Sequence, residues 1–362
     1  MKEFLARGLS CLLASVSIGL AQEVASRPSV GAIRWDAWTG GEITRIVEQT
    51  LAPKKYHFRL PWFAEVSGDD SVRIDGSRPG IMEEEIDFAA QAGLDYWAFV
   101  LYPESSSMSR GLELYRRSAR RKHINFCVIL HATLGVPAAQ WPLERDRILK
   151  LLREPVYQTV LDGRPLIYAF QMGAQASAVR FAELLREARA AGVNPYCVYM
   201  GWEPVADFRR ESAHGFDAVS AYACGSADET FAQLCRRVET RNWQRPAAAK
   251  VPFVPFVSTG WEKRPRQDHP VPWEKNQTYH TQKVFPSIAT ADEIASHLTA
   301  ALQVARDNQQ LCAANTLIIY AWNEHDEGGW LAPTWTPGGK PDTGRIEALA
   351  RVLRPAGTAA RQ

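Results

Sequence analysis

Short apolar runs alternate with longer amphipathic stretches along the whole chain. The apolar runs are nearly continuous in hydrophobicity, which is typical of parallel strands covered on both faces. They predict eight strands, at Val30–Trp35, Asp95–Tyr102, Ile124–His131, Pro165–Phe170, Tyr196–Trp202, Ala218–Cys224, Pro252–Ser258 and Thr316–Trp322. The amphipathic stretches have helical spacing and predict helices at Met82–Ala92, Leu112–Lys122, Val179–Ala191, Phe231–Thr240 and Ile294–Asn308.

Two of the predicted helices have capping boxes at their starts. Ser226 with Glu229, and Thr290 with Glu293, have the spacing at which a hydroxyl and a carboxylate satisfy otherwise unpaired backbone donors. Gly93 stands where a helix is expected to end.

Eight strand–helix units favour a closed α/β barrel of the (β/α)₈ TIM type, which needs about 250 residues. We expect one such catalytic barrel over residues 28–356, with two insertions that account for the extra length. Pro53–Val66 is expected to form a hairpin after the first unit, and residues 259–290 a long loop after strand seven. A doubly wound open sheet is the alternative, but no glycine-rich phosphate loop follows the first strand.

Composition and charge narrow the class of protein. The chain has 362 residues, 46% hydrophobic and 23% charged, the balance of a soluble globular protein. The formal net charge of +2 indicates no nucleic-acid or anionic-membrane partner. No HExxH, Walker, GxGxxG or GxSxG motif occurs, and the eight His are scattered, so we expect no metal site and no cofactor. The oligomeric state stays open.

The first 21 residues have the features of a signal peptide. Lys2 and Arg7 precede the apolar stretch Gly8–Leu20, and small residues follow at the cleavage site. A membrane anchor is disfavoured because this stretch is shorter than the roughly 20 residues that span a bilayer. Lipid attachment at Cys11 is disfavoured because almost no apolar residues precede it. We therefore expect a secreted or periplasmic protein without stable membrane insertion.

The mature chain would keep an odd number of cysteines: Cys127, Cys197, Cys224, Cys235 and Cys312. None has CxxC spacing, so neither a disulfide framework nor a zinc site is expected. Cys127 and Cys197 fall within predicted strands, where a thiol usually behaves as a small buried hydrophobe.

The carboxyl ends of the predicted strands collect aromatic, amide and carboxylate side chains. In a barrel of this type the active site forms at those ends. Aromatic faces can pack on the C–H faces of sugar rings, while carboxylates and amides bind hydroxyl groups, so a carbohydrate ligand is predicted. The candidate substrate-binding residues are Trp35, Asp36, Trp38, Tyr102, His131, Trp202, Tyr222, Trp261, Trp322 and Asn323.

Ordinary structural roles remain open for several of these candidates. Asp36 is equally consistent with a turn or helix cap. For Tyr102 and Tyr222, packing at the top of a barrel is the more common role of an aromatic residue at a strand end. His131 is equally consistent with a core position.

Other aromatic and basic side chains belong to the two insertions. Trp261 and Trp273 could form a subsite wall or simply anchor the long loop. Arg59 and Trp62 could overhang the cleft from the inserted hairpin.

The run Trp322–Trp330 contains the most specific candidates, Glu324 and Glu327. Residues at i and i+3 point the same way on a helical turn. Two carboxyl groups a few ångströms apart cannot both ionise easily, so they can supply one acid and one base, as glycoside hydrolysis requires. An exposed acidic turn is the structural alternative. Glu104 and Glu203 are held in reserve for the pair.

At these residues the chain resembles the endo-α-mannosidase family of glycoside hydrolases (family ninety-nine) and its WbsX-like relatives. Trp322–Gly328 resembles the Asn-Glu-x-x-Glu-Gly signature of that family. The similarity extends to GLDYWAFVLYPE at the second strand, STGWEKRPR after the seventh, and GGWLAPT after the signature. His325-Asp326 stand where the family has Trp-His.

The resemblance implies a role for each carboxyl group. Glu324 would assist the 2-hydroxyl of the sugar, and Glu327 would protonate the leaving oxygen. A 1,2-anhydro sugar and net retention would result. Backside attack needs the 2-oxygen anti to the leaving group, which suits an α-mannoside. With an α-glucoside, Glu324 or Asp36 would instead be an ordinary nucleophile.

Together these features predict an exported, retaining glycoside hydrolase that cleaves an α-linked oligo- or polysaccharide, with α-mannosides favoured. A glycan-binding barrel without turnover is one alternative, favoured by His325-Asp326. A glycosyltransferase of polysaccharide assembly, a role attributed to WbsX-like relatives, is another. It would need a donor site, and no DxD element lies near a predicted strand end.

Overall fold

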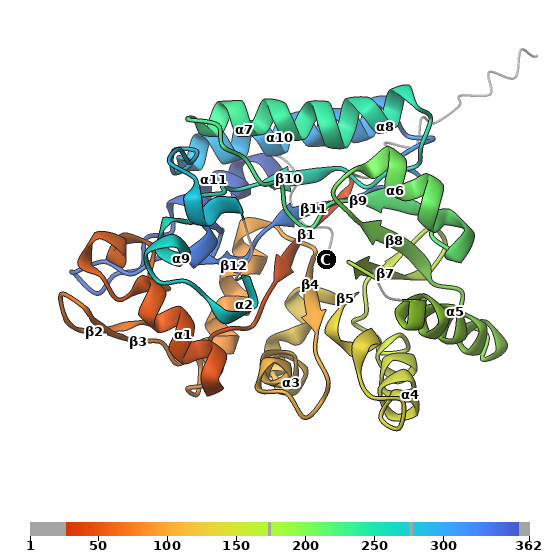
Figure 1. Ribbon diagram of the computed structural model, residues 1–362, viewed down its shortest axis with the longest axis horizontal. Coiled ribbons are helices and arrows are strands. Elements are labelled where there is room, and N and C mark those ends of the chain that lie inside the picture. The colour runs from red at the N-terminus through yellow and green to blue at the C-terminus, as the bar shows by residue number, and fades with distance from the viewer. Residues whose placement is uncertain (1–26, 173–174, 275–277, 355–362) are drawn as a thin grey trace, which may run out of the picture.

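Eight parallel strands form a nearly closed ring with helices around it, which confirms the predicted (β/α)₈ barrel (Figure 1). The computed structural model describes residues 27–172, 175–274 and 278–354, so the predicted signal peptide lies outside the described residues. All eight predicted strands are present. They are β1 (Ser29–Arg34), β4 (Tyr96–Leu101), β5 (Asn125–Leu130), β7 (Arg164–Phe170), β8 (Tyr196–Met200), β9 (Ala218–Ser220), β10 (Phe256–Ser258) and β11 (Thr316–Tyr320).

The strand order around the ring is β10-β11-β1-β4-β5-β7-β8-β9, and every pair in it is parallel. Val219 bridges the seam between β9 and the chain leading into β10. Its amide donates to Pro252 O at 3.0 Å, and its carbonyl accepts from Val254 N at 2.9 Å. This bridge excludes an open doubly wound sheet. The short strand β6 (Thr159–Val160) pairs antiparallel with β7 outside the ring.

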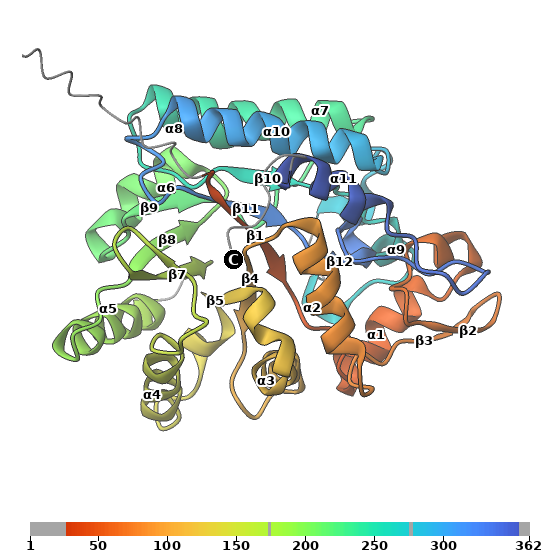
Figure 2. The same ribbon diagram turned by 180° about the vertical axis from the view of Figure 1, so that it is seen from behind.

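Helices pack around the outside of the ring, as Figures 1 and 2 show from opposite sides. They are α1 (Gly41–Leu51), α2 (Ile81–Ala92), α3 (Arg110–Arg117), α4 (Trp141–Leu151), α5 (Gln175–Ala190), α6 (Pro204–Glu211), α7 (Phe231–Val238), α8 (Arg245–Ala248), α9 (Arg264–Asp268), α10 (Ala291–Asp307) and α11 (Gly344–Leu353). Each longer helix turns one apolar stripe inward. On α10 the buried positions include Ile294, Leu298 and Ala301, at helical spacing.

Of the two capping boxes predicted from the sequence, one is present in the structure and the other is not. Thr290 and Glu293 form the predicted capping box of α10, with N···O distances of 3.2 and 2.9 Å. The predicted box at Ser226 is wrong, because Thr230 and Gln233 cap α7 one turn later. The Ser226 hydroxyl instead accepts from the amide of Asp228 at 2.9 Å and closes a local turn.

The predicted helix Leu112–Lys122 is interrupted at Ser118. That residue has extended backbone (φ −66°, ψ 135°), and a 3₁₀ turn (Ala119–His123) follows it. The Ser118 hydroxyl accepts from the amide of Arg120 at 3.1 Å, so it caps the new turn rather than continuing α3.

The first insertion contains the predicted hairpin at a later position. Lys54–Arg59 forms a 3₁₀ helix, and the hairpin consists of β2 (Glu65–Gly68) and β3 (Ser71–Arg73). Tyr56 and Arg59 are buried, so this part of the insertion packs on the barrel instead of alternating as an exposed strand. The hairpin itself lies at the periphery (Figures 1 and 2).

The second insertion, residues 259–290, follows β10 as predicted but contains structure of its own. It includes α9 and 3₁₀ turns at Pro272–Glu274 and Thr278–Thr281. The Gln267 amide nitrogen donates to three backbone carbonyls of this segment at 2.8 to 3.2 Å. One partly buried amide thereby supplies donors to backbone carbonyl groups of a segment that belongs to no sheet.

The described cysteines contribute to the packing of the barrel and form no cross-links. All five cysteines of the described residues are free, and Cys127 and Cys197 are fully buried in β5 and β8. Among residues 27–172, 175–274 and 278–354, no helix combines the length and the apolar character that crossing a bilayer requires.

The barrel interior contains a hydrogen-bonded layer around Tyr96. Its hydroxyl lies 2.9 Å from that of Tyr168 and 3.0 Å from that of Thr316. The ring of Tyr96 fills the space beside Gly31, where an added Cβ would lie 2.1 Å from the ring. Glycine is required at this position because a tyrosine of the neighbouring strand occupies the room of its side chain.

We therefore predict that Gly31→Ala destabilises the protein by about 1–3 kcal/mol, because Tyr96 must leave its hydrogen-bonded position. Gly135→Ala is the matched control. No atom lies within 4 Å of its added Cβ, and the change should stay within about 0.5 kcal/mol. Denaturant unfolding of both variants measures the difference, and equal stabilities would contradict the prediction.

Candidate active site

A short hairpin after β11 presents the two predicted catalytic residues. It consists of β12 (Asn323–Glu324), a 3₁₀ turn (His325–Glu327) and β13 (Gly329–Trp330). We call residues 323–330 the acidic hairpin. Gly328 has φ +82°, and a Cβ there would lie 2.5 Å from the backbone nitrogen of Glu262. Only glycine can close this turn against the loop that follows β10.

The two residues before the glutamates hold the acidic hairpin to the barrel. The Asn323 amide donates to Trp35 O at 2.8 Å and accepts from Trp35 N at 2.9 Å. Trp322 is fully buried, and its indole N–H donates to Glu85 at 2.9 Å. Neither side chain lines the cavity described next. Their predicted role in sugar binding is therefore corrected to a positioning role, since their polar groups are already satisfied inside the barrel.

A cavity of about 520 Å³ opens beside the acidic hairpin at the carboxyl ends of the strands. This volume lies in the usual range for small-molecule sites. Eight predicted site residues line it together: Glu324, Glu327, Trp35, Tyr102, His131, Trp202, Tyr222 and Trp261.

Two further predicted residues of the first strand end do not reach the cavity. Asp36 is buried, receives a hydrogen bond from Arg34 at 2.8 Å, and packs against Gly111. Trp38 is buried edge-on against the ring of His325, with centroids 5.4 Å apart. The prediction that they contact sugar is corrected because both point into the structure that supports the acidic hairpin.

The weaker candidates from the first insertion also lie away from the cavity. Arg59 is buried beneath the loop after β10, where it forms an ion pair with Glu262. Trp62 packs edge-on against Phe63 and Phe88. Neither overhangs the cleft.

Glu104 and Glu203, the reserve carboxylates, are both exposed and outside the cavity lining. Glu203 lies 3.4 Å from Arg241 in a surface ion pair. Of the four glutamates considered for the catalytic pair, only Glu324 and Glu327 of the acidic hairpin line the cavity.

Two groups of aromatic rings line the cavity. In one group Trp35 meets Trp273 edge-on, with centroids 5.8 Å apart. In the other, Phe170 stacks on Tyr222 at 4.6 Å and meets Trp202 edge-on at 5.9 Å. Trp202 and Trp273 are 40% and 38% exposed, so each offers accessible ring surface. His131 is held against the second group by a contact of its Nδ1 with Phe170 O at 3.0 Å.

The two glutamates have different partners. The Tyr222 hydroxyl donates to Glu324 Oε1 at 2.8 Å, while Glu324 Oε2 is buried with no hydrogen bond to any described residue. Glu327 Oε1 lies 2.9 Å from Lys263 Nζ and also accepts from Arg266. Glu327 Oε2 accepts from the Tyr320 hydroxyl.

Arg266 of α9 is the centre of a buried ionic cluster, which we call the Arg266 cluster. Its guanidinium donates to Asp326 at 2.7 and 3.1 Å and to Glu274 at 3.0 Å. It also donates to Glu327 and lies 3.5 Å from Glu324 Oε2. Lys263 adds a second cation, 2.8 Å from Glu274. Four carboxyl groups thus share two buried cations.

Because the carboxyl groups outnumber the cations, the pKa values of the carboxyl groups are shifted by different amounts and in different directions. Burial and the charge of Glu327 raise the pKa of Glu324 well above its ordinary value, and Arg266 opposes the shift only in part. Burial acts in the same direction on Glu274, but Arg266 and Lys263 outweigh it and lower the pKa of Glu274 to about 2. The cluster therefore contains two carboxyl groups whose pKa values are shifted in opposite directions.

The residues between the two glutamates face away from the cavity. His325 is fully buried, stacks on Trp330 with centroids 5.6 Å apart, and contacts Arg59 O through Nδ1. Burial lowers the pKa of His325 to about 3, so the imidazole is neutral. Asp326 binds Arg266 through both oxygens. The departure from the family signature therefore alters the support of the site rather than its cavity surface.

Several cavity residues were not predicted as site residues from the sequence: Lys263, Arg266, Glu274 and Phe170. Lys263 and Arg266 belong to the basic run directly after strand seven. A cluster of positive charge at a strand end, opposite an acidic turn at the next strand end, is the signal that could have identified them. Glu274 had no such signal, because it lies in a loop far from any predicted strand.

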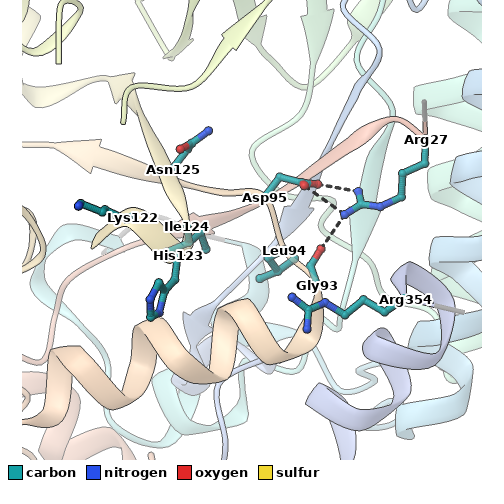
Figure 3. Close-up of a pocket in the computed structure, with 9 residues that line it drawn as sticks. All are labelled: Arg27, Gly93, Leu94, Asp95, Lys122, His123, Ile124, Asn125 and Arg354. Carbon is teal, nitrogen blue, oxygen red and sulfur yellow. Dashed lines mark hydrogen bonds and ion pairs between the residues drawn. The ribbon is translucent and has the colours of Figure 1, made fainter. Parts of the chain in front are cut away.

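A second cavity, of about 260 Å³, lies at the other end of the barrel (Figure 3). Most of its residues precede or begin β1, β4 and β5, Arg354 follows α11, and Arg27 there binds Asp95 at 2.6 Å. In barrels of this type, residues at that end usually contribute to stability rather than to catalysis. Among the described residues no group of His, Cys, Asp and Glu has a geometry that could hold a metal ion.

The fold and site define a (β/α)₈ barrel with a buried carboxyl pair at the mouth of an aromatic-walled cavity. The chain is similar in fold to the GH99 endo-α-mannosidase from Bacteroides thetaiotaomicron, with a TM-score of 0.54, 14% identity, and coverage of 90% of this chain and 95% of that one. A structure of the same enzyme class from that organism in complex with bis-tris-propane matches equally, with 94% of its chain covered. No protein-family model matches the chain, and no curated protein sequence matches it significantly.

We predict that Glu324→Gln stabilises the fold near neutral pH. A carboxyl group whose pKa is raised on folding disfavours the folded state once the pH exceeds its ordinary pKa of about 4.3. Glutamine removes that penalty and keeps an acceptor for Tyr222. We expect a rise in Tm of about 2 °C or more at neutral pH.

The gain should disappear below about pH 4, where Glu324 is protonated in both the folded and the unfolded state. The exposed Glu104→Gln is the matched control and should leave Tm unchanged at every pH. A Tm gain that does not depend on pH, or a loss at neutral pH, would contradict the prediction.

Proposed function

We propose that this protein is a glycoside hydrolase that cleaves an α-linked glycan. The observation that carries the proposal is the position of Glu324 and Glu327, which both line one cavity at the carboxyl ends of the strands. A pair of carboxyl groups in different electrostatic surroundings can act as proton donor and proton acceptor at one pH. The fold likeness to glycoside hydrolases supports the same class of reaction.

The walls of the cavity fit a saccharide. Ring surface is exposed at Trp202 and Trp273, which line the same cavity as the carboxyl pair. The cavity also offers Tyr102, His131 and Gln171 as hydrogen-bonding groups. Aromatic faces with a few polar groups suit a ligand that has both C–H faces and hydroxyl groups.

An α-mannoside and a retaining reaction are the finer parts of the proposal, and they rest on the resemblance of the acidic hairpin. In that reaction the 2-oxygen of the sugar attacks C1 while the leaving oxygen receives a proton. An axial 2-hydroxyl lies anti to an axial leaving group, as an α-mannoside provides. The pair supplies one group for each proton, and the chain needs no cofactor for these steps.

The place of action is also proposed from the sequence. The predicted signal peptide, residues 1–21, would deliver the enzyme to the periplasm or outside the cell, where polymeric glycans are available. The net charge of +2 fits a neutral saccharide as partner rather than nucleic acid.

To test the reaction, the purified mature protein is incubated with mannans, α-glucans and host-type glycans, and product masses and anomeric configuration are measured together. We expect products of α-linkage cleavage with retained configuration. Inverted products would exclude the anhydro-sugar route. Binding without product release across the panel would instead indicate a glycan-binding barrel, and transfer from a nucleotide or lipid donor a glycosyltransferase.

We predict that Glu324→Gln and Glu327→Gln each lower kcat on the natural type of linkage by about 10²–10⁴-fold, the usual contribution of general acid–base groups. Glu104→Gln, a carboxylate outside the cavity, should retain wild-type turnover. Near-normal turnover in either variant of the pair would contradict its assignment to the catalytic site.

We predict that Trp202→Ala and Trp273→Ala each raise KM about tenfold and change kcat less, because both rings contact the substrate before and during reaction alike. Phe58→Ala is the matched control, since Phe58 is a half-exposed ring outside this cavity. Steady-state kinetics on a soluble oligosaccharide distinguish the three variants. An unchanged KM in both tryptophan variants would show that these two rings do not bind the glycan.

A further inference from the structure

Gln171, the first residue after β7, has a left-handed backbone with φ +47°. A residue with a Cβ adopts this conformation only rarely, because its side chain crowds the neighbouring peptide groups. Four other non-glycine residues of the described chain have positive φ: Leu161, Asp162, Lys250 and Asn315. None of these four lines the cavity beside the acidic hairpin, whereas Gln171 does. The strained backbone at Gln171 therefore coincides with the candidate active site.

Contacts on both sides hold the backbone of Gln171 in place. The Nδ1–H of His131 donates to Phe170 O at 3.0 Å and fixes the peptide group that joins Phe170 to Gln171. Met172, the next residue, is buried. The side chain of Gln171 itself is exposed and lines the cavity. A glycine would adopt this conformation without strain, and strained residues of this kind gather at functional sites. The pattern indicates that the side chain of Gln171 has a role in the cavity.

The carboxamide of Gln171 makes no hydrogen bond to any described residue. Every other hydroxyl, imidazole or charged side chain that lines the cavity has at least one such bond. A carboxamide donates through its nitrogen and accepts through its oxygen. A sugar hydroxyl also donates and accepts, so the two groups can pair in either direction.

The strand order places Gln171 across the ring from the acidic hairpin. Around the closed ring β7 is four strands from β11 in both directions, so the two strands are opposite each other. Trp202 follows β8, which pairs with β7 in a register that matches Phe170 to Met200. The ring of Trp202 also meets that of Phe170 edge-on at 5.9 Å. A free amide and an accessible aromatic ring are thus found at adjoining strand ends.

We propose that Gln171 binds a hydroxyl group of the glycan, and that its left-handed backbone holds the amide in position for this contact. The proposal rests on the proposed function and adds a specificity-determining residue to it. The sugar unit that Gln171 contacts is the one whose C–H face packs on Trp202. Because the amide has no partner within the described protein, a saccharide with a hydroxyl group at this position binds more tightly than an analogue that lacks it.

Two substitutions separate the amide from the backbone. Gln171→Met keeps the length of the side chain and the left-handed strain but removes the hydrogen-bonding groups. Gln171→Gly removes the amide and the strain together. We expect each variant to raise the Kd for a saccharide about three- to tenfold, the contribution of one neutral hydrogen bond. Thermal unfolding should give Gln171→Gly a Tm no lower than that of the wild type, because the relief of strain offsets the flexibility of glycine.

Lys250→Gly is the matched control for the backbone. Lys250 is exposed, has φ +54° and lies outside the cavity lining. Its replacement by glycine should also leave Tm no lower than that of the wild type, and it should leave the Kd for a saccharide unchanged.

The probes are an S-linked α-dimannoside, an S-linked α-diglucoside and their mono-deoxy analogues, each of which lacks one hydroxyl group. The sulfur linkage resists hydrolysis, so calorimetry measures binding without turnover. The wild type should bind one deoxy analogue about three- to tenfold more weakly than its parent. Gln171→Met should bind that analogue and the parent equally, because removing either partner removes the same hydrogen bond.

Three results would overturn the proposal. The first is an unchanged Kd in Gln171→Met. The second is an equal loss of affinity for the parent and for every deoxy analogue, since a change in cavity shape would produce that pattern. The third is a wild type that binds neither S-linked saccharide. A Tm of Gln171→Gly clearly below that of the wild type would overturn the part assigned to the backbone.

Turnover of the O-linked glycans is measured separately and tests the proposed function. Binding that depends on Gln171, with no O-linked glycan cleaved, would contradict hydrolysis and retain Gln171 as a glycan-binding residue. Cleavage with the same Kd in the wild type and in Gln171→Met would support hydrolysis and overturn the assignment of Gln171.

Discussion

The rest of the site depends on the ion pairs and hydrogen bonds that the guanidinium of Arg266 forms. Four carboxyl groups surround it, and three of them, Glu324, Asp326 and Glu327, lie within four consecutive residues of the acidic hairpin. Ionised carboxylates this deeply buried are stable only when cations and hydrogen bonds replace the lost water. Arg266 meets that requirement from α9, a helix of the loop after β10. The second insertion is therefore part of the candidate site, because it provides the positive charge that balances a hairpin after a different strand.

The Arg266 cluster nevertheless has more carboxyl groups than cations. The carboxyl group with the fewest partners is Glu324, which lines the cavity. Asp326 is bound through both of its oxygens, and Glu274 is bound by Arg266 and Lys263. Glu324 is left with a tyrosine hydroxyl and an oxygen that no described residue satisfies. A fold selected for stability alone would satisfy or remove such an atom. Because Glu324 lines the cavity, a bound ligand could satisfy this oxygen.

The sequence could predict the elements whose signal is local. Eight buried strands are readable because each is a short apolar run, and strand order then follows from the barrel closure. The glutamate pair is readable because both members lie in one turn. Asp36 and Trp38 were placed wrongly for a related reason. Their position at a strand end is local, but the direction of their side chains depends on Arg34 and His325, which come from the packing of distant segments. Glu274 was missed because only tertiary structure brings it to the cluster.

His325 and Asp326 differ from the family signature that the acidic hairpin resembles, but neither residue lines the cavity. In the turn, Glu324 and Glu327 face the cavity while the two residues between them face the barrel. His325 stacks on an aromatic ring as a neutral imidazole, so the size of this side chain matters more than its charge. Asp326 is different, since it brings a negative charge into contact with Arg266. That charge adds to the increase in the pKa of Glu324, which Arg266 opposes. A residue that does not line the cavity can in this way change the acidity of a carboxyl group that does.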